Sequence, residues 1–376
     1  MKLTVQVKLL PTREQANALE DTLRASNAAA NGISEMAWGH RSFGRSKLHK
    51  LVYRPVRASS GLSSQMVIRA ISKVADAYKL DRKRKRTFKA LGAIAYDDLI
   101  LRWRSEASEV SIWTVGGRER IPFVCGERTS ELLEFRRGES DLVFRCGKWF
   151  LLATVEVEAP PPGTPEDWIG VDLGIANIAT DSDGEVHTSE QTERSRKRYE
   201  RIRSRLQAAG TRSAKRHLKK LAKRERRMKR DTNHVISKRL VSKAAETGRG
   251  IGLEDLQGIR KRTTVRKAQR SRHGKWAFGE LRAFIEYKAR LAGVAVAAVD
   301  PRDTTRPCSE CGSCDKANRL SQVQFICKSC GYVAPADENA ALNIRSRAVV
   351  NQPTVARVEA SLSAHSYKPT HLAVGS

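Results

Sequence analysis

The spacing of apolar and polar residues near the start of the chain predicts a strand followed by helices. Residues 3–9 alternate in the manner of a half-buried strand, and residues 13–38 have the spacing of a helix that is rich in Ala and Leu. Thr12 and Gln15 stand at the separation of a capping box, which places the start of this helix. The polar, basic stretch 40–64 contains Gly, Ser and Pro, so it predicts a loop or a weakly packed helix, and another amphipathic helix follows it.

Between residues 93 and 158 the period of the pattern changes to two, which is typical of β-strands. Gly147 separates two strongly apolar runs, 142–145 and 150–155, and this arrangement predicts a hairpin. The section ends at Pro-Pro-Pro-Gly, residues 160–163, where we predict a domain boundary.

Apolar runs and one long basic segment alternate in the second half of the chain. Strands are predicted at residues 168–172, 250–254 and 295–299, and a final helix at 337–349. Residues 194–230 contain 18 Lys and Arg against two Glu, yet a thin stripe of Leu and Met runs through them. We therefore predict a long helix or a helix pair there, in place of an unstructured tail.

The charge is the most informative property of the composition. The chain has 376 residues, 40% of them apolar and 30% charged, which is typical of a globular protein. Its 70 Lys and Arg exceed its 41 Asp and Glu by 29, as expected of a protein that works on a polyanion such as nucleic acid. No apolar run is long enough to span a bilayer, and the first residues lack a signal-peptide pattern. We therefore expect a cytoplasmic protein, with no membrane partner.

Three dense basic runs, at residues 82–89, 194–230 and 260–275, are candidates for contact with phosphates. A charge run is commonly only a solvated helix face, but runs this dense and this weakly opposed favour contact with nucleic acid. The candidate residues are Arg82, Lys83, Arg84, Lys85, Arg86, Arg196, Lys197, Arg198, Lys219, Lys220, Arg226, Arg227, Arg260, Lys261 and Arg262.

Four of the seven cysteines have the spacing of a metal site. Cys308 and Cys311 form one Cys-x-x-Cys knuckle, Cys327 and Cys330 form another, and a glycine directly follows each knuckle. Thiolates at this spacing bind zinc tetrahedrally, and a closed four-thiolate site has no open position for catalysis. We therefore predict one structural zinc ion, with the surplus Cys314 as a bystander.

Three carboxylates occupy unusual places in the predicted elements. Asp172 ends an apolar strand, Glu254 ends another, and Asp337 begins a helix. Buried carboxylates are costly unless they are paired or bind metal, so we expect the three to hold two Mg²⁺ ions for phosphodiester hydrolysis. Each acid taken alone also fits a simpler role, as a turn residue, a surface acid or a helix cap. Glu254 is preferred to its neighbour Asp255, because successive side chains of a strand point to opposite faces.

These motifs, in this order, resemble those of TnpB, the transposon-encoded RNA-guided DNA endonuclease that is related to the type V CRISPR effectors. Residues 170–175, Gly-Val-Asp-Leu-Gly-Ile, are similar to the first motif of the family's RuvC nuclease domain. Residues 252–256 look like the second motif and 337–344 like the third, with the zinc ribbon between them in the family's order. The similarity is strong from about residue 168 to 344 and loose before residue 160.

The resemblance implies an α/β multidomain fold with Asp172, Glu254 and Asp337 as metal ligands. An RNase H-like RuvC nuclease domain would contain an inserted zinc ribbon, and an N-terminal β-barrel (wedge) domain would be interrupted by a helical recognition domain. The expected boundaries are 1–12 and 93–160 for the wedge barrel, 13–92 for the recognition domain, 165–300 for the RuvC domain with a basic helical insertion at 190–230, 301–334 for the zinc ribbon or target-nucleic-acid-binding domain, 335–350 for the third RuvC motif and final helix, and 351–376 for a flexible tail.

The resemblance also implies an RNA-guided, divalent-metal-dependent endonuclease that cleaves double-stranded DNA beside a short adjacent motif. The partner would be a guide RNA transcribed from the transposon end, held by a monomer in the cytosol or nucleoid of a prokaryote. In such systems base pairing reads the target sequence.

Other functions fit part of the sequence. One is an RNA-guided DNA-binding repressor that does not cut. Another is a transposase that acts directly on transposon ends, although a zinc ribbon between the second and third acids argues against it. A plain zinc-containing RNA-binding protein would leave the three acids unexplained.

Overall fold

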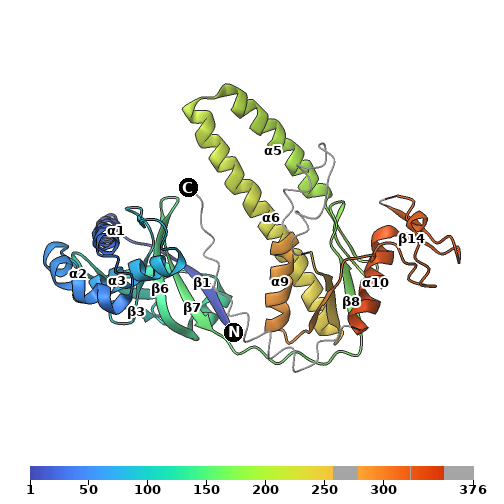
Figure 1. The fold of residues 1–376 in the computed structure, drawn as a ribbon, viewed down its shortest axis with the longest axis horizontal. Coiled ribbons are helices and arrows are strands. Elements are labelled where there is room, and N and C mark those ends of the chain that lie inside the picture. Colours follow the sequence, from blue (N-terminus) through green and yellow to red (C-terminus); the bar gives the residue numbers. More distant parts are fainter. Residues whose placement is uncertain (257–277, 322, 351–376) are drawn as a thin grey trace. The chain divides into compact units, whose positions relative to one another are not determined.

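The computed structural model describes residues 1–256, 278–321 and 323–350. The chain forms two compact units, residues 1–158 and 159–376 (Figure 1). Three of the candidate phosphate contacts, Arg260, Lys261 and Arg262, lie outside the described residues, as does the tail 351–376.

The first unit is built on an antiparallel sheet of seven strands in the order β2-β6-β7-β1-β5-β4-β3 (Figure 1). Tyr96 of the edge strand β2 donates its hydroxyl hydrogen to the carbonyl of Trp113 in β4, next to the opposite edge, over 3.0 Å. The sheet therefore curls until its two edges nearly meet, which fits the predicted β-barrel. The strands are β1 (Lys2–Leu9), β2 (Ile94–Tyr96), β3 (Leu101–Arg104), β4 (Glu109–Thr114), β5 (Gly117–Val124), β6 (Arg136–Arg145) and β7 (Lys148–Glu156).

Three helices separate β1 from β2: α1 (Arg13–Gly39), α2 (Arg45–Ser59) and α3 (Ser64–Leu80). The predicted start of α1 is confirmed, because Thr12 and Gln15 cap each other's backbone N–H groups over 3.1 and 3.2 Å. Helix α2 lies where only a loop or a weakly packed helix was expected, and it buries three apolar residues at every fourth position. These are Leu48, Val52 and Val56.

The predicted hairpin at Gly147 is confirmed as β6 and β7. Cys146 and Gly147 form its turn, both at positive φ, which glycine adopts without strain. One further short helix of this unit, α4 (Glu127–Leu133), follows β5.

The second unit is built on a mixed sheet of five strands in the order β10-β9-β8-β11-β12. Strands β8, β9 and β10 are antiparallel to one another in turn, whereas β11 is parallel to both β8 and β12. The strands are β8 (Trp168–Asp172), β9 (Asn177–Asp181), β10 (Val186–Thr188), β11 (Gly250–Glu254) and β12 (Val296–Val299).

Helices cover the two faces of this sheet, as Figure 1 shows. Helices α6 (Arg212–Glu246) and α9 (Phe278–Leu291) pack on the side chains of Ile169 and Leu253 on one face. Helix α10 (Ala336–Val350) packs on the other face, where Ile344 joins Trp168 in a small apolar core.

The basic segment forms the helix pair that was one of the two predicted arrangements. Helix α5 (Glu190–Ala209) runs to a left-handed Gly210, and the long α6 returns beside it (Figure 1). Glu225 of α6, which is 7% exposed, pairs with Arg203 of α5 over 2.6 Å and with Lys229 over 3.3 Å. This buried acid therefore ties together two helices that would otherwise repel each other.

Candidate functional site

Two of the three predicted acids emerge at the same edge of the second sheet. Strands β8 and β11 are parallel neighbours, and Val171 pairs with Leu253. The residues that come next, Asp172 and Glu254, therefore lie beside each other at the carboxyl ends of the two strands. Side chains alternate along a strand, so both acids lie on the face where Gly170 and Gly252 meet α10. Asp255 lies one position further on and pairs with Arg282 of α9 over 2.6 Å.

Helix α10 brings the third acid to this edge. Asp337 lies in its first turn, and the helix approaches the sheet so closely that glycine is required beneath it. A Cβ on Gly252 would lie 2.8 Å from the Cβ of Ala348, and one on Gly170 would overlap the backbone of Ala341. The glycines therefore let the helix lie directly on the strands that end in the two other acids.

The three carboxylates interact electrostatically. Burial, reinforced by the negative charges of Glu254 and Asp337, raises the pKa of Asp172 to about 8. Burial also raises the pKa of Glu254, which is 7% exposed. A carboxylate that is buried beside other carboxylates is destabilised in its ionised form. A cation bound among the three acids would stabilise that ionised form.

Three polar residues that the sequence analysis did not single out contact these acids. Thr304 donates a hydrogen bond to Oε1 of Glu254. Asp337 accepts a hydrogen bond from the side-chain amide of Asn177 over 2.9 Å, and the guanidinium of Arg319 lies 3.8 Å from its other oxygen.

Among the described residues, the three carboxylates are more widely spaced than the sulfurs of the four predicted zinc ligands. In the part of the chain that the structure describes, only the sulfurs of the four cysteines form a metal-binding group of three or more side chains whose ligand atoms all lie within 4.8 Å of one another. A wider spacing of the acids is the arrangement that mutual repulsion of three carboxylates favours.

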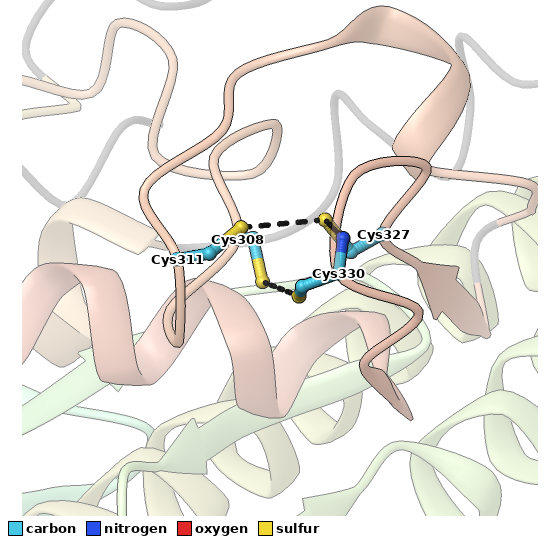
Figure 2. Close-up of side chains that lie close together, drawn as sticks. All are labelled: Cys308, Cys311, Cys327 and Cys330. Carbon is cyan, nitrogen blue, oxygen red and sulfur yellow. Dashed lines mark hydrogen bonds between the residues drawn. The ribbon is translucent and has the colours of Figure 1, made fainter.

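The two cysteine knuckles face each other in the zinc ribbon (Figure 2). The sulfurs of Cys308 and Cys330 are 3.7 Å apart, and those of Cys311 and Cys327 are 3.6 Å apart. A tetrahedral zinc ion with Zn–S bonds of about 2.3 Å requires sulfurs roughly 3.8 Å apart, so the four-cysteine cluster fits a structural zinc site. Cys314 is exposed and does not belong to the cluster.

Local structure prepares the knuckles for metal. Gly312 and Gly331, directly after them, have φ of 72° and 76°, as the predicted tight turns require. The backbone N–H groups of Cys330 and Ser329 hold the pKa of the Cys327 thiol below its ordinary value, which favours the thiolate that binds zinc. The small hairpin of the ribbon consists of β13 (Gln324–Ile326) and β14 (Val333–Pro335), and the short helix η1 (Lys316–Asn318) precedes it.

Helix α10 also holds the segment that leads into the ribbon. Asn343 donates hydrogen bonds to the carbonyls of Thr304 and Pro307 over 3.0 and 2.8 Å. Asn339 donates to Pro307 over 2.9 Å and accepts from the backbone N–H of Ser309 over 3.0 Å. The first knuckle is thus fixed to the helix that carries Asp337.

The candidate phosphate contacts differ in their surroundings. Lys219, Lys220, Arg226 and Arg227 are exposed on α6. By contrast, Arg196 is bound to Glu193 and Glu200 of its own helix over 2.9 and 2.7 Å. In the first unit, further members of the set form ion pairs, Lys85 with Glu35 and Arg86 with Asp81. In the part of the chain that the structure describes, no helix is long and apolar enough to cross a membrane.

Two family models match segments between residues 152 and 344. Residues 152–263 match a family described as a probable transposase, OrfB of IS605, and residues 278–344 match the Cas12f1-like TNB domain. The first match includes Asp172 and Glu254, and the second includes the zinc ribbon and Asp337.

Several curated proteins are similar to parts of the chain. The CRISPR-associated endodeoxyribonuclease Cas12f1 of Sulfoacidibacillus thermotolerans is 42% identical over 114 residues, which are 30% of this chain and 26% of that protein. The putative RNA-guided DNA endonuclease InsQ of Escherichia coli is 29% identical over 219 residues, 53% of this chain and 54% of that one. A TnpB-like protein of Methanocaldococcus jannaschii is 36% identical over 128 residues, 34% of this chain and 45% of that one. The chain thus spans between about a quarter and a little over half of the length of these relatives.

Proposed function

Because the relationship to TnpB is confirmed by both matched families and by these relatives, we propose that the chain is an RNA-guided, divalent-metal-dependent DNA endonuclease. The observation that supports this most directly is the gathering of Asp172, Glu254 and Asp337 at one sheet edge, where their charges interact. The proposed substrate is double-stranded DNA next to a short adjacent motif, and the proposed partner is a guide RNA from the transposon end, bound by one copy of the chain.

The three acids suit magnesium. Carboxylate oxygens are the ligands that Mg²⁺ prefers, and carboxylates that are unfavourable as free anions gain most from a cation among them. Asp172, whose carboxylate interacts with the charges of the other two acids, would hold the ions together with Glu254 and Asp337. A bound pair of Mg²⁺ ions would supply an activated water and would stabilise the leaving 3′-oxygen in phosphodiester hydrolysis.

The surroundings of the acids support their role as ligands. The hydroxyl of Thr304 fixes one oxygen of Glu254, and the amide of Asn177 fixes one oxygen of Asp337. Hydrogen bonds of this kind orient metal-binding carboxylates. Arg319 adds a positive charge beside Asp337, where a phosphate of the substrate would approach.

The remaining parts of the chain are assigned by the same proposal. The mixed sheet with acids at its edge supports an RNase H-like RuvC domain, and the nearly closed sheet of the first unit supports the wedge barrel, with α1, α2 and α3 as the recognition helices. The net charge of +29 suits a protein that holds RNA and DNA together.

The test is to purify the full chain, sequence the RNA that accompanies it, and offer the complex a plasmid library that contains the matching target. We expect double-strand breaks that require Mg²⁺ and are absent for Asp172→Asn, whereas binding of the target is retained. Target binding by the wild type without any break would favour the RNA-guided repressor. Joining of transposon-end DNA in the absence of RNA would favour the transposase and overturn the proposal.

A further inference from the structure

We propose that Thr304 is a positioning residue that fixes Glu254 for metal binding, and that α10 holds Thr304 in place through Asn343. This proposal rests on the proposed function, because it assigns a role to Thr304 within the same site.

Thr304 and Glu254 form a buried pair. Thr304 is 1% exposed and Glu254 is 7% exposed, and the threonine hydroxyl donates its hydrogen to Oε1 of the glutamate. The hydrogen bond holds one oxygen of Glu254 at a defined position and thereby fixes the orientation of the carboxylate group.

The position of Thr304 is itself fixed by backbone contacts. Asn343, which is 8% exposed, donates to the Thr304 carbonyl and, three residues further along the chain, to that of Pro307. Asn339, which is fully buried, forms hydrogen bonds with the same segment, to the Pro307 carbonyl and from the Ser309 backbone N–H. Both asparagines belong to the helix whose first turn contains Asp337.

A continuous set of contacts therefore connects two of the acids. It runs from Glu254 through the hydroxyl and carbonyl of Thr304 to Asn343, and along α10 to Asp337. Because the same segment enters the first cysteine knuckle at Cys308, the geometry of the acids and the folding of the zinc ribbon depend on one short stretch of chain.

A purely structural role for Thr304 makes a different prediction. The hydroxyl also lies 3.3 Å from the Pro301 carbonyl, so it helps to close the turn after β12. If that were its whole function, its loss would lower the stability of the chain and leave the affinity for Mg²⁺ unchanged.

The experiment compares Thr304→Val, which has the same shape without the hydroxyl, with Thr304→Ser, which restores the donor. The matched control is Thr305→Val, since the described part of the chain offers no hydrogen-bond partner to the Thr305 hydroxyl. Each full-length protein, with its copurified RNA, is titrated with Mg²⁺ by calorimetry, and its melting temperature is recorded with and without Mg²⁺. Cleavage of the matching target is measured over the same range of Mg²⁺ concentration.

We expect Thr304→Val to raise the Mg²⁺ concentration for half-maximal binding and cleavage by roughly 10- to 100-fold, the usual cost of losing a hydrogen bond to a metal ligand. Thr304→Ser and Thr305→Val should remain within about threefold of the wild type. Unchanged Mg²⁺ binding by Thr304→Val, with only a lower melting temperature, would overturn the proposal.

Two further outcomes are decisive. If the wild type binds Mg²⁺ but cuts no DNA, the proposed function fails, while the ratio of Mg²⁺ affinities between Thr304→Val and Thr304→Ser still decides the role of Thr304. If Thr304→Val does not fold, Thr304→Cys keeps the size of the side chain with a weaker donor, and an Mg²⁺ affinity equal to that of the wild type would overturn the proposal.

Discussion

Gly170 in β8 lies directly beneath the carbonyl of Ala341 in α10, with no room for a side chain between them. The backbone of Arg345, one turn further along the helix, is almost as close. Because Asp172 is two positions after Gly170 on the same face of the strand, this close approach is what places the first turn of α10, and Asp337 in it, near the carboxyl end of β8.

Replacing Gly170 by alanine should therefore separate the helix from the sheet. A Cβ that overlaps a helix backbone forces a shift of the helix, and overpacking of this kind costs about 1–3 kcal/mol or more. We expect a lower melting temperature and loss of cleavage for Gly170→Ala. The control is Gly279→Ala in α9, where no described atom lies within 4 Å of the added Cβ, and it should leave both properties nearly unchanged.

Asp172→Asn should abolish cleavage and at the same time stabilise the metal-free chain. The variant removes a carboxylate whose pKa is raised to about 8 by burial and by its acidic neighbours, so at pH 8 the melting temperature should rise by a few degrees. Added Mg²⁺ should stabilise the wild type and not the variant. Calorimetric melting with and without Mg²⁺ measures both effects.

Asp255→Asn is the matched control for that experiment, because Asp255 pairs with Arg282 on the other face of the sheet. It should keep cleavage and the response to Mg²⁺. If Asp255→Asn lost cleavage while Asp172→Asn remained active, Asp172 would not be a catalytic acid and Asp255 would take its place.

Removing one cysteine of the cluster should release the metal and unfold the ribbon. In Cys327→Ser the thiolate that the backbone N–H groups favour is lost, and structural zinc contributes directly to folding. We expect less than one zinc per chain by elemental analysis, together with loss of cleavage. Cys314→Ser, outside the cluster, should retain one zinc per chain. A full zinc content in Cys327→Ser would contradict the assignment.

Exposed lysines of α6 should contribute to nucleic-acid affinity in proportion to their charge. The double variant Lys219→Ala and Lys220→Ala should weaken RNA binding and reduce the slope of log K against log salt concentration by up to about 2. Arg196→Ala should change the slope much less, because Arg196 is already bound to Glu193 and Glu200. Filter binding at several salt concentrations distinguishes the two.

Features with a local cause could be predicted from the sequence. The capping box of Thr12 and Gln15, the hairpin at Gly147 and each single Cys-x-x-Cys knuckle depend on residues within a few positions of one another, and the structure contains all of them. Helix α2 was predicted only in part, since basic residues surround its apolar positions and Pro55 lies inside it.

Features that depend on distant contacts had no signal in the sequence. Thr304 and Arg319 are ordinary polar residues within their own segments, and they gain a role only because β11, the ribbon and α10 meet. The pairing of Lys85 with Glu35, 50 positions away, was equally hidden within a uniform basic run.

The order of elements in the second unit has a consequence for synthesis. The sheet is complete once β12 has been made, but its third acid arrives only with α10, 165 positions after Asp172. A polypeptide that has been synthesised only as far as β12 therefore contains the basic helices and two of the three acids, without the third. Under the proposed function, the metal site is completed only after α10 has been synthesised, so a product truncated before α10 would bind nucleic acid without cutting it.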